Sequence, residues 1–361
     1  MLTIHSVVLV LLAMAALGLQ AIEERYREAA RLYEEGKLPE AEQVLRQILR
    51  DEPSFPPARF QLGAVCLAQG QVDEARALFE GLASQYASSS EIVFQVAVVY
   101  FLAEDLVTAR TYLNRVLELD PRHPEATLTL GQLEGLEGND EQALALLGDA
   151  TVLSPSDVAP HYYRAAILDR LGRHGEAADA LQEALRVSPH DGRLLRFLGA
   201  VYVTLEQWPH AVSVLEEAIR NGAVDPDVYL DLGRAHLGQE QLAPARTAFE
   251  KSLELKRSAE PLLQLGYIAW RLSDYDRAVW LLEECIALDP DLMRAYHFLG
   301  LIALRKGELQ RAERYFLDAL ARDQGFAEAQ FNLGKITLRQ GKTERAVELF
   351  LEAVKSSPDY K

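Results

Sequence analysis

The sequence predicts an all-α protein, a right-handed superhelical solenoid of about ten helix pairs stacked in a row. Two observations carry this prediction. Alanine recurs at a constant interval through most of the chain, as at Ala41, Ala75 and Ala109, and a second small residue precedes each alanine at a constant distance. Self-similarity at a fixed period is typical of arrays in which each unit packs only on its neighbours. We therefore expect residues 22–361 to form one elongated array instead of two or three globular domains.

The two columns of small residues run in phase along the whole chain after residue 21. Because a small side chain lets backbones come close, we expect these columns to lie where the two antiparallel helices of one unit touch. The alanine column is Ala41, Ala75, Ala109, Ala143, Ala177, Ala211, Ala245, Ala278, Ala312 and Ala346. The earlier column is Ala29, Gly63, Ala97, Gly131, Ala165, Gly199, Gly233, Gly266, Gly300 and Gly334.

A third column, one helical turn after each alanine, is always large and apolar. We expect these side chains to fill the space between neighbouring units. The column is Leu45, Phe79, Leu113, Leu147, Leu181, Leu215, Phe249, Leu282, Phe316 and Phe350.

Glycine and proline mark the ends of the expected helices. Glycine can take the left-handed conformation at a helix C-terminus, so the turn inside a unit is expected at Gly36, Gly70, Gly138, Gly172, Gly307 and Gly341. In four units the same place holds Glu104, Glu206, Glu240 and Ser273. Pro39 and Pro209 suit the first turn of a second helix. The end of a unit is expected at Pro53, Pro121, Pro155, Pro189, Pro290 and Pro358.

These columns resemble the tetratricopeptide repeat. The last two units show the pattern well, as LGLIALRKGELQRAERYFLDAL and LGKITLRQGKTERAVELFLEAV. The resemblance covers residues 22–361 and places ten units with starts near residues 22, 56, 90, 124, 158, 192, 226, 259, 293 and 327. It implies that each unit is a helix A followed by a helix B. The unit that begins at 226 is one residue short, so we expect an irregularity near residues 255–262.

Segment 1–21 contains an unbroken apolar run from Val7 to Leu19. A transmembrane helix needs about 20 apolar residues, whereas the core of a signal peptide needs about 7–15. The run is too short for the first and fits the second. Segment 1–21 is therefore interpreted as a signal peptide or an N-terminal membrane anchor. An apolar capping helix on the first unit is the alternative.

Composition and motifs favour a binding protein without catalytic chemistry. The net charge of −17 argues against nucleic acid and anionic lipid as partners, because both are polyanions. The sequence lacks the phosphate-binding, metalloprotease and nucleophile motifs, and its histidines are scattered. We therefore expect no enzymatic activity, no cofactor and no metal. Cys66 and Cys285 occupy apolar columns and are expected to be separate, buried thiols.

In the family that the sequence resembles, the A helices line a concave groove. The resemblance places aromatic side chains there in the N-terminal half of the chain, at Tyr26, Tyr33, Phe60, Phe94, Phe101 and Tyr162. Aromatic side chains are favoured anchors for partners. Packing between adjacent A helices is the alternative explanation.

The C-terminal units place a different chemistry in the groove. Arg271, Arg305 and Arg339 recur at the repeat spacing, and Trp270, Arg294 and Lys335 lie at other groove positions. Residues 259–361 have a net charge of −2, so the rest of the chain holds −15. This pattern predicts a site for a carboxylate or an acidic peptide segment. The alternative is a column that is basic because it faces solvent. The lysine and asparagine clamp of the chaperone-binding subclass is absent, since its positions hold Tyr26, Ala30, Gln61 and Ala64.

The last helix B has no capping helix after it. Val347, Phe350 and Val354 are therefore expected to form an exposed terminal edge that meets a partner or a second copy of the chain.

These features together predict a non-enzymatic scaffold that binds peptide or protein partners in its groove. Segment 1–21 would deliver the scaffold to the cell envelope, periplasmic or secreted, for the assembly of a secretion or polysaccharide-handling complex. The alternative is a membrane-anchored adaptor or regulator that faces the cytoplasm.

Overall fold

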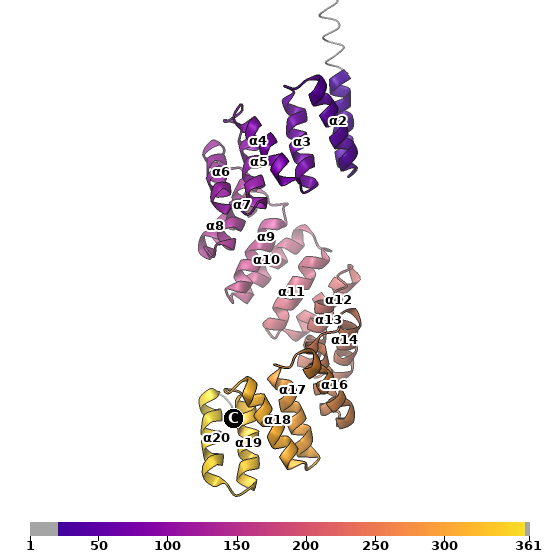
Figure 1. Cartoon of the computed structure of the whole chain (residues 1–361), viewed down its shortest axis with the longest axis vertical. Coiled ribbons are helices and arrows are strands. Elements are labelled where there is room, and N and C mark those ends of the chain that lie inside the picture. The colour runs from indigo at the N-terminus through magenta and orange to yellow at the C-terminus, as the bar shows by residue number, and fades with distance from the viewer. Residues whose placement is uncertain (1–20, 358–361) are drawn as a thin grey trace, which may run out of the picture. The chain divides into compact units, whose positions relative to one another are not determined.

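The computed structural model describes residues 21–357, and every regular element in this range is an α-helix (Figure 1). The chain divides into two compact units, which end and begin at Leu171 and Gly172. Each unit is a row of helices in which consecutive helices pack on each other. The prediction of an all-α solenoid is confirmed.

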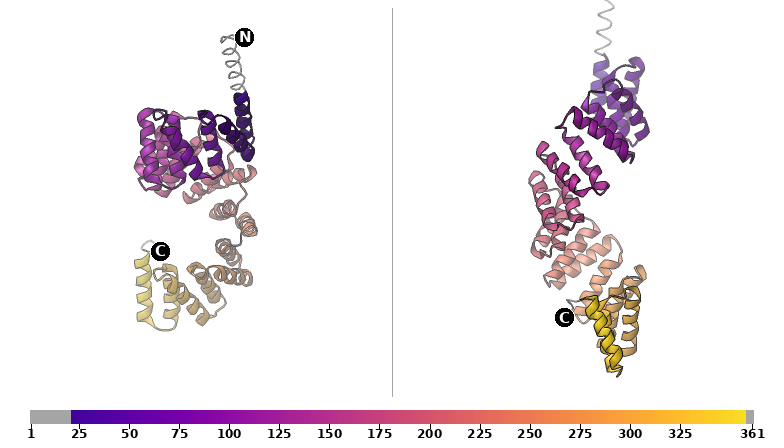
Figure 2. Two further views of the ribbon diagram at one scale, coloured as in Figure 1. Left: turned by 45° about the horizontal axis from the view of Figure 1, so that its top comes forward. Right: turned by 90° about the vertical axis from the view of Figure 1, so that its left-hand side faces the viewer.

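Unit 1 holds nine helices in its described part (Figure 2). The first covers residues 21–34. It is followed by α2 (Leu38–Asp51), α3 (Pro56–Ala68), α4 (Val72–Ala83), α5 (Ser90–Leu102), α6 (Leu106–Leu119), α7 (Pro124–Leu136), α8 (Asp140–Leu153) and α9 (Ala159–Arg170).

Unit 2 continues the alternation of A and B helices. It holds α10 (His174–Val187), α11 (Gly192–Thr204), α12 (Trp208–Arg220), α13 (Pro226–Gly238), α14 (Leu242–Leu255), α15 (Ala259–Arg271), α16 (Tyr275–Leu288), α17 (Met293–Arg305), α18 (Leu309–Arg322), α19 (Ala327–Arg339) and α20 (Thr343–Ser356). The odd-numbered helices from α3 to α19 are the A helices, and each begins at or next to a unit start read from the sequence.

The small column and the large apolar column meet inside each unit. A Cβ atom added to Gly63 would lie 2.6 Å from the ring of Phe79, and one added to Gly233 would lie 2.5 Å from the ring of Phe249. Helix A can approach helix B this closely only because no side chain intervenes. The large side chains cover the small residue of their own unit, and Phe249 also packs in one core with Leu262 and Ile268 of the next unit.

The turn between helix A and helix B is left-handed whether or not glycine is present. The turn glycines have positive φ, for example +76° at Gly70. Glu104, Glu206, Glu240 and Ser273 take φ of 60°, 56°, 60° and 61° at the same place. The turn geometry is thus imposed by the packing of the two helices, and these four residues accept a conformation that costs L-residues about 1–2 kcal/mol.

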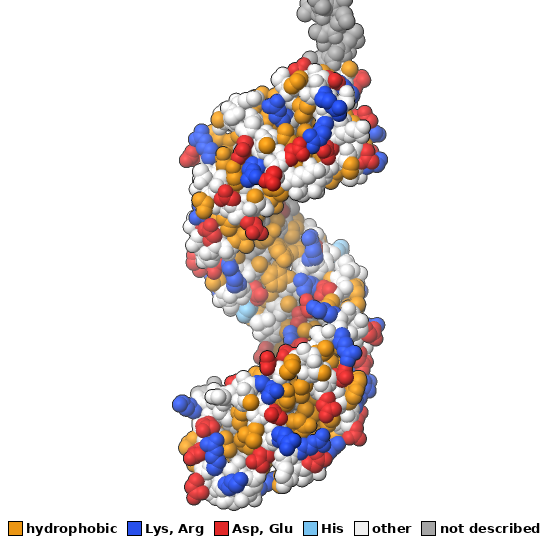
Figure 3. Space-filling view, in the orientation of Figure 1, with side chains coloured by type: hydrophobic (Ala, Val, Ile, Leu, Met, Phe, Trp, Pro, Cys, Tyr) orange, Lys and Arg blue, Asp and Glu red, His pale blue; other side chains and the backbone are white. Residues whose placement is uncertain are grey.

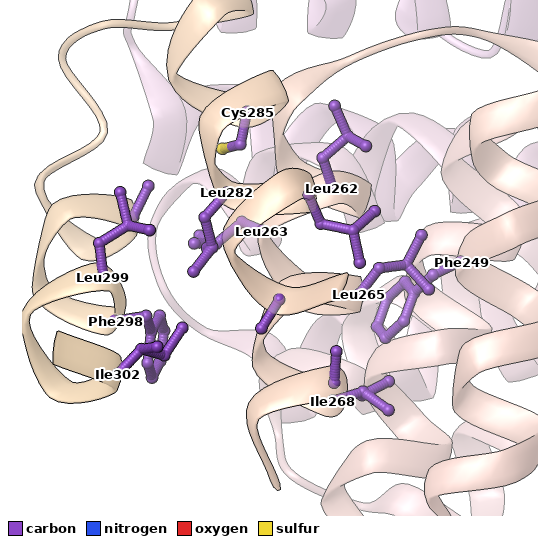
Figure 4. Close-up of a cluster of buried hydrophobic side chains, with 14 of the residues drawn as sticks. Phe249, Leu262, Leu263, Leu265, Ile268, Leu282, Cys285, Phe298, Leu299 and Ile302 are labelled. Carbon is purple, nitrogen blue, oxygen red and sulfur yellow. The ribbon is translucent and has the colours of Figure 1, made fainter. Parts of the chain in front are cut away.

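The core of unit 2 is continuous from α14 to α17 (Figure 4). Phe249, Leu282 and Cys285 are fully buried in it. Cys66 is buried in unit 1, and both cysteines are free thiols. Burial raises the pKa of Cys66 to about 11 and that of Cys285 to about 12, so both thiols remain protonated and act as small apolar side chains.

The expected irregularity near residues 255–262 is present and local. Helix α14 ends at Leu255 and α15 begins at Ala259, so only residues 256–258 connect them. Ser252, almost fully buried, replaces a small apolar residue of the repeat, and its hydroxyl donates to the carbonyl of Pro226 at 2.7 Å. The shortened unit keeps both of its helices because the connection absorbs the missing residue.

The predicted signal or anchor segment, residues 1–21, lies outside the described residues except for its last position. Within residues 21–357, no helix is both long and apolar enough to cross a membrane.

Candidate partner-binding surfaces on the A helices

Three A helices of unit 2 form a cavity of about 380 Å³. It lies on α15, α17 and α19 and is open to solvent. Its lining residues are Trp270, Leu301, Leu304, Arg305, Asn332, Lys335, Ile336 and Arg339. Four residues predicted from the sequence are therefore brought together, namely Trp270, Arg305, Lys335 and Arg339. We call this cavity the cationic pocket.

The cationic pocket carries positive charge that is not neutralised by the protein. Arg305, Lys335 and Arg339 are exposed, and none of them forms an ion pair with a carboxylate among the residues the structure describes. The Nζ of Lys335 lies 5.3 Å from the ring centroid of Phe331. No Asp or Glu lines the cavity. Figure 3 shows apolar side chains over α17 and α18, with both basic and acidic side chains around them.

The other two predicted cations of unit 2 lie outside the cavity lining. Arg271 is exposed and donates from Nη1 to the hydroxyl of Tyr267 at 2.9 Å. This hydrogen bond raises the pKa of Arg271 and keeps its guanidinium over the Tyr267 ring. Arg294 is exposed at the start of α17.

A buried polar pair supports the cationic pocket from below. Asn332, 8% exposed, donates from Nδ2 to the carbonyl of Glu328 at 2.8 Å, and the same nitrogen lies 3.2 Å from Nε2 of His297. His297 is 9% exposed, and its ring contacts Phe316 and Phe326. Burial, with a smaller effect of Arg294, lowers the pKa of His297 to about 4.

His297 is therefore neutral near pH 7, and its Nε2 accepts the hydrogen bond from Asn332. The pair connects α17 to α19 under the pocket floor. Sequence reasoning missed this pair, because a lone histidine and a lone asparagine on different helices have no pattern in common.

The aromatic residues predicted in unit 1 lie on A helices but differ in exposure. Tyr33 and Tyr162 are each 38% exposed, whereas Tyr26, Phe60 and Phe101 are half-buried. Phe94 is only 9% exposed and packs on His123, with ring centroids 4.9 Å apart. The prediction that Phe94 faces a partner is wrong, because its ring belongs to the core of α5 and α7.

Two exposed leucines in unit 1 were missed. Leu102 is 53% exposed at the end of α5, and Leu136 is 66% exposed at the end of α7. They occupy the column that holds Arg271, Arg305 and Arg339 in unit 2. The repeat spacing assigns both leucines to this column, so they could have been identified from the sequence. The same column thus holds an exposed leucine in two repeats of unit 1, whereas it holds arginine in three repeats of unit 2 and at Arg170 of unit 1.

The terminal edge is exposed only in part. Val347 and Val354 on α20 are 50% and 54% exposed. Phe350 is half-buried, contrary to expectation, because its ring covers Gly334 of the same unit and contacts Phe331 at a centroid distance of 5.6 Å.

No group of His, Cys, Asp and Glu side chains within residues 21–357 is arranged to hold a metal ion. Among the described residues, the surfaces that stand out are the cationic pocket and the exposed leucines of unit 1. Helices that pair and stack in this way define the class of α-helical repeat proteins.

Within that class, the chain belongs to the tetratricopeptide repeat family. Models described as Tetratricopeptide repeat match residues 32–93, 137–192, 198–260, 263–325 and 299–361. The resemblance seen in the sequence is therefore confirmed, and with it the general role of a scaffold for protein–protein interaction. No curated protein matches this chain in sequence.

Solved structures share the fold at low sequence identity. The pilF protein of Pseudomonas aeruginosa is 21% identical, with a TM-score of 0.50, over 58% of this chain and 96% of that one. A tetratricopeptide repeat protein from Parabacteroides merdae is 20% identical, with a TM-score of 0.49, over 69% and 99%. MamA from Desulfovibrio magneticus is 24% identical, with a TM-score of 0.45, over 47% and 96%. At these levels the likeness concerns the fold alone.

Proposed function

We propose that this protein is a non-enzymatic scaffold whose cationic pocket binds an acidic, partly apolar segment of a partner protein. The observation that carries the proposal is the group of three exposed cations, Arg305, Lys335 and Arg339, in a cavity that also has apolar lining residues and no lining carboxylate.

The pocket chemistry fits such a segment in two ways. Trp270 and Leu304 offer apolar surface for one aliphatic or aromatic side chain of the ligand. The two guanidinium groups form bidentate hydrogen bonds with carboxylates, and Lys335 adds a third positive charge. Because no carboxylate among the described residues pairs with these cations, a ligand carboxylate does not have to displace an internal partner.

The exposed leucines of unit 1, Leu102 and Leu136, support an additional contact with an apolar partner segment. Apolar and cationic contacts on different repeats would let one scaffold hold partners of different chemistry.

The place of action is proposed from the sequence. The apolar run from Val7 to Leu19 favours delivery to the cell envelope, periplasmic or secreted, where the scaffold would serve the assembly of a secretion or polysaccharide-handling complex. The alternative is an adaptor anchored by the same segment and facing the cytoplasm. N-terminal sequencing of the mature protein separates a cleaved signal from a retained anchor. The exposed Val347 and Val354 support self-association or partner contact at α20.

The binding proposal is tested with a fluorescent peptide of alternating glutamate and leucine, titrated with the full chain. We expect saturable binding that weakens as salt is added. Combined charge reversal of Arg305, Lys335 and Arg339 to Glu should weaken it by at least about a hundredfold, since each charge-assisted contact contributes about 1.5–3 kcal/mol.

Arg314→Glu is the matched control, because Arg314 is an exposed arginine on α18 outside the cavity. It should leave the affinity nearly unchanged. Equal losses in the control and in the triple variant, or no binding of the acidic peptide, would show that the pocket is not the site.

A further inference from the structure

Trp280 on α16 is an aromatic side chain that the repeat does not require. It is 58% exposed. The corresponding residue in every other unit is small or polar, and this column reads Gln43, Ala77, Thr111, Ala145, Asp179, Ser213, Thr247, Arg314 and Glu348. A singly exposed apolar side chain is ordinary, whereas Trp280 lies at the edge of a cleft that also has apolar lining residues.

Trp280 forms one wall of a cleft of about 480 Å³ between the B helices α14 and α16. Leu253 of α14, which is half-buried, supplies further apolar surface, and Leu262 of α15 lies beneath the cleft, almost fully buried. This cleft shares no residue with the cationic pocket. It is therefore a separate surface, which we call the Trp280 cleft.

The rim of the Trp280 cleft is mainly acidic. Three carboxylates line it, from Glu250, Glu254 and Glu284, against one guanidinium, from Arg257. The charge is thus opposite to that of the cationic pocket.

Each of these three carboxylates forms an ion pair with a cation at the protein surface. Glu250 accepts from Arg277 at 3.2 Å, and Glu254 accepts from Lys251 at 2.6 Å. Glu284 pairs with Arg257. Pairs between side chains this exposed contribute about 0–1 kcal/mol, so an incoming cation can replace the existing partner at little cost.

Two departures from the repeat pattern coincide at this cleft. The unit that ends before α15 lacks one residue, and Arg257 of the short connection, residues 256–258, lies at the rim. Trp280 is the second departure. Neither is needed to build the helix pairs, since the neighbouring units form without them.

We propose that the Trp280 cleft is a second docking surface, which binds a partner segment that presents an arginine or lysine beside an aliphatic side chain. The ligand cation would lie over the indole face and donate hydrogen bonds to the rim carboxylates. Its methylene stem and the neighbouring aliphatic side chain would cover Leu253 and the edge of Trp280. This surface goes beyond the proposed acidic-ligand function and would let the scaffold hold a basic partner at the same time.

The test uses the full chain and a fluorescent peptide of alternating arginine and leucine, followed by anisotropy. We expect saturable binding. Trp280→Ala should weaken it by at least about tenfold, as expected for a central aromatic anchor, whereas Trp280→Phe should retain part of the affinity. The double variant Glu254→Gln with Glu284→Gln should weaken it by about threefold or more.

Two controls distinguish binding at the Trp280 cleft from non-specific attraction of a basic peptide to an acidic protein. Leu351→Ala removes another exposed apolar side chain, 65% exposed on α20, and should not change the affinity. The charge reversal of Arg305, Lys335 and Arg339 to Glu should abolish binding of the glutamate peptide and leave tight binding of the arginine peptide in place.

The proposal is overturned if the arginine peptide does not bind, or if Trp280→Ala and Leu351→Ala behave alike. It is also overturned if the glutamate peptide competes for the Trp280 cleft, or if sedimentation shows that Trp280 mediates pairing of two copies of this chain. Each of these results leaves the acidic-ligand function of the cationic pocket unaffected.

Discussion

Nε2 of His297 and Nδ2 of Asn332 lie 3.2 Å apart, and this contact joins the A helices of two successive repeats beneath the cationic pocket. Because burial keeps His297 neutral, the contact persists near pH 7. The floor of the pocket is therefore held by a polar contact that requires an uncharged imidazole.

Unit 2 is expected to lose stability in mild acid. The pKa of His297 is lowered from 6.5 to about 4 by burial, so the unfolded chain binds a proton at a higher pH than the folded chain does. The stabilisation is fully present above pH 6.5 and is lost as pH falls toward 4. At pH 4.5 the free energy of unfolding, measured in urea, should be about 2 kcal/mol lower than it is above pH 6.5 as a result of this group.

His297→Leu isolates this effect from the titration of carboxylates. The variant should show a weaker dependence of unfolding on pH between 6.5 and 4.5 than the wild type. Asn332 keeps its hydrogen bond to the carbonyl of Glu328, so its amide is not left without a partner. Parallel pH profiles for the two proteins would contradict the assignment.

Gly233→Ala should destabilise unit 2 by about 1–3 kcal/mol. The added Cβ would lie 2.5 Å from the Phe249 ring, so α13 and α14 would have to separate. Thermal unfolding followed by circular dichroism measures the effect. Gly148→Ala is the control, because nothing lies within 4 Å of its Cβ on α8, and alanine there should stabilise by about 0.5–1 kcal/mol.

Glu104→Gly should stabilise unit 1 by about 1 kcal/mol. Glu104 has a φ of 60° in the turn between α5 and α6, where glycine is free of the Cβ clash. The reverse change, Gly70→Ala at a φ of +76°, should destabilise by a similar amount. Shifts of the same sign for both variants in urea unfolding would show that the turn does not impose the left-handed conformation.

Arg322→Met should lower the stability of unit 2 by about 1–2 kcal/mol. The guanidinium lies 3.9 Å from the ring centroid of Tyr296 and donates to the Tyr296 hydroxyl at 2.8 Å and to the carbonyl of Pro290 at 2.7 Å. Methionine keeps the aliphatic stem and loses all three contacts. Arg314→Met, on the exposed side of the same helix, should have no measurable effect on the unfolding midpoint.

Much of the fold could be predicted because small and large residues alternate at a fixed period. Ala41 and its counterparts are fully buried, as their column required. It was harder to predict which residues the side chains of each column contact. The ring of Phe350 covers a glycine of its own unit, which the spacing alone did not distinguish from a contact across units.

The candidate site was predictable where one column repeats a charge. Arg305 and Arg339 lie together because helices one repeat apart present the same column side by side. The exposure of Phe94 could not be predicted from its column, since its burial depends on contact with His123 in the next repeat. The Trp280 cleft is likewise lined by residues from three helices and one connection, which no single column describes.

The sequence by itself determined that this chain is a row of helix pairs, where each pair begins and ends, and which columns face inward. It could do so because helix pairing depends on side-chain size at a regular spacing, which is a local property. Only the tertiary structure decided which of the outward-facing side chains gather. Exposure and pocket formation depend on the side chains that neighbouring helices place in the same space, and that is set by packing between repeats.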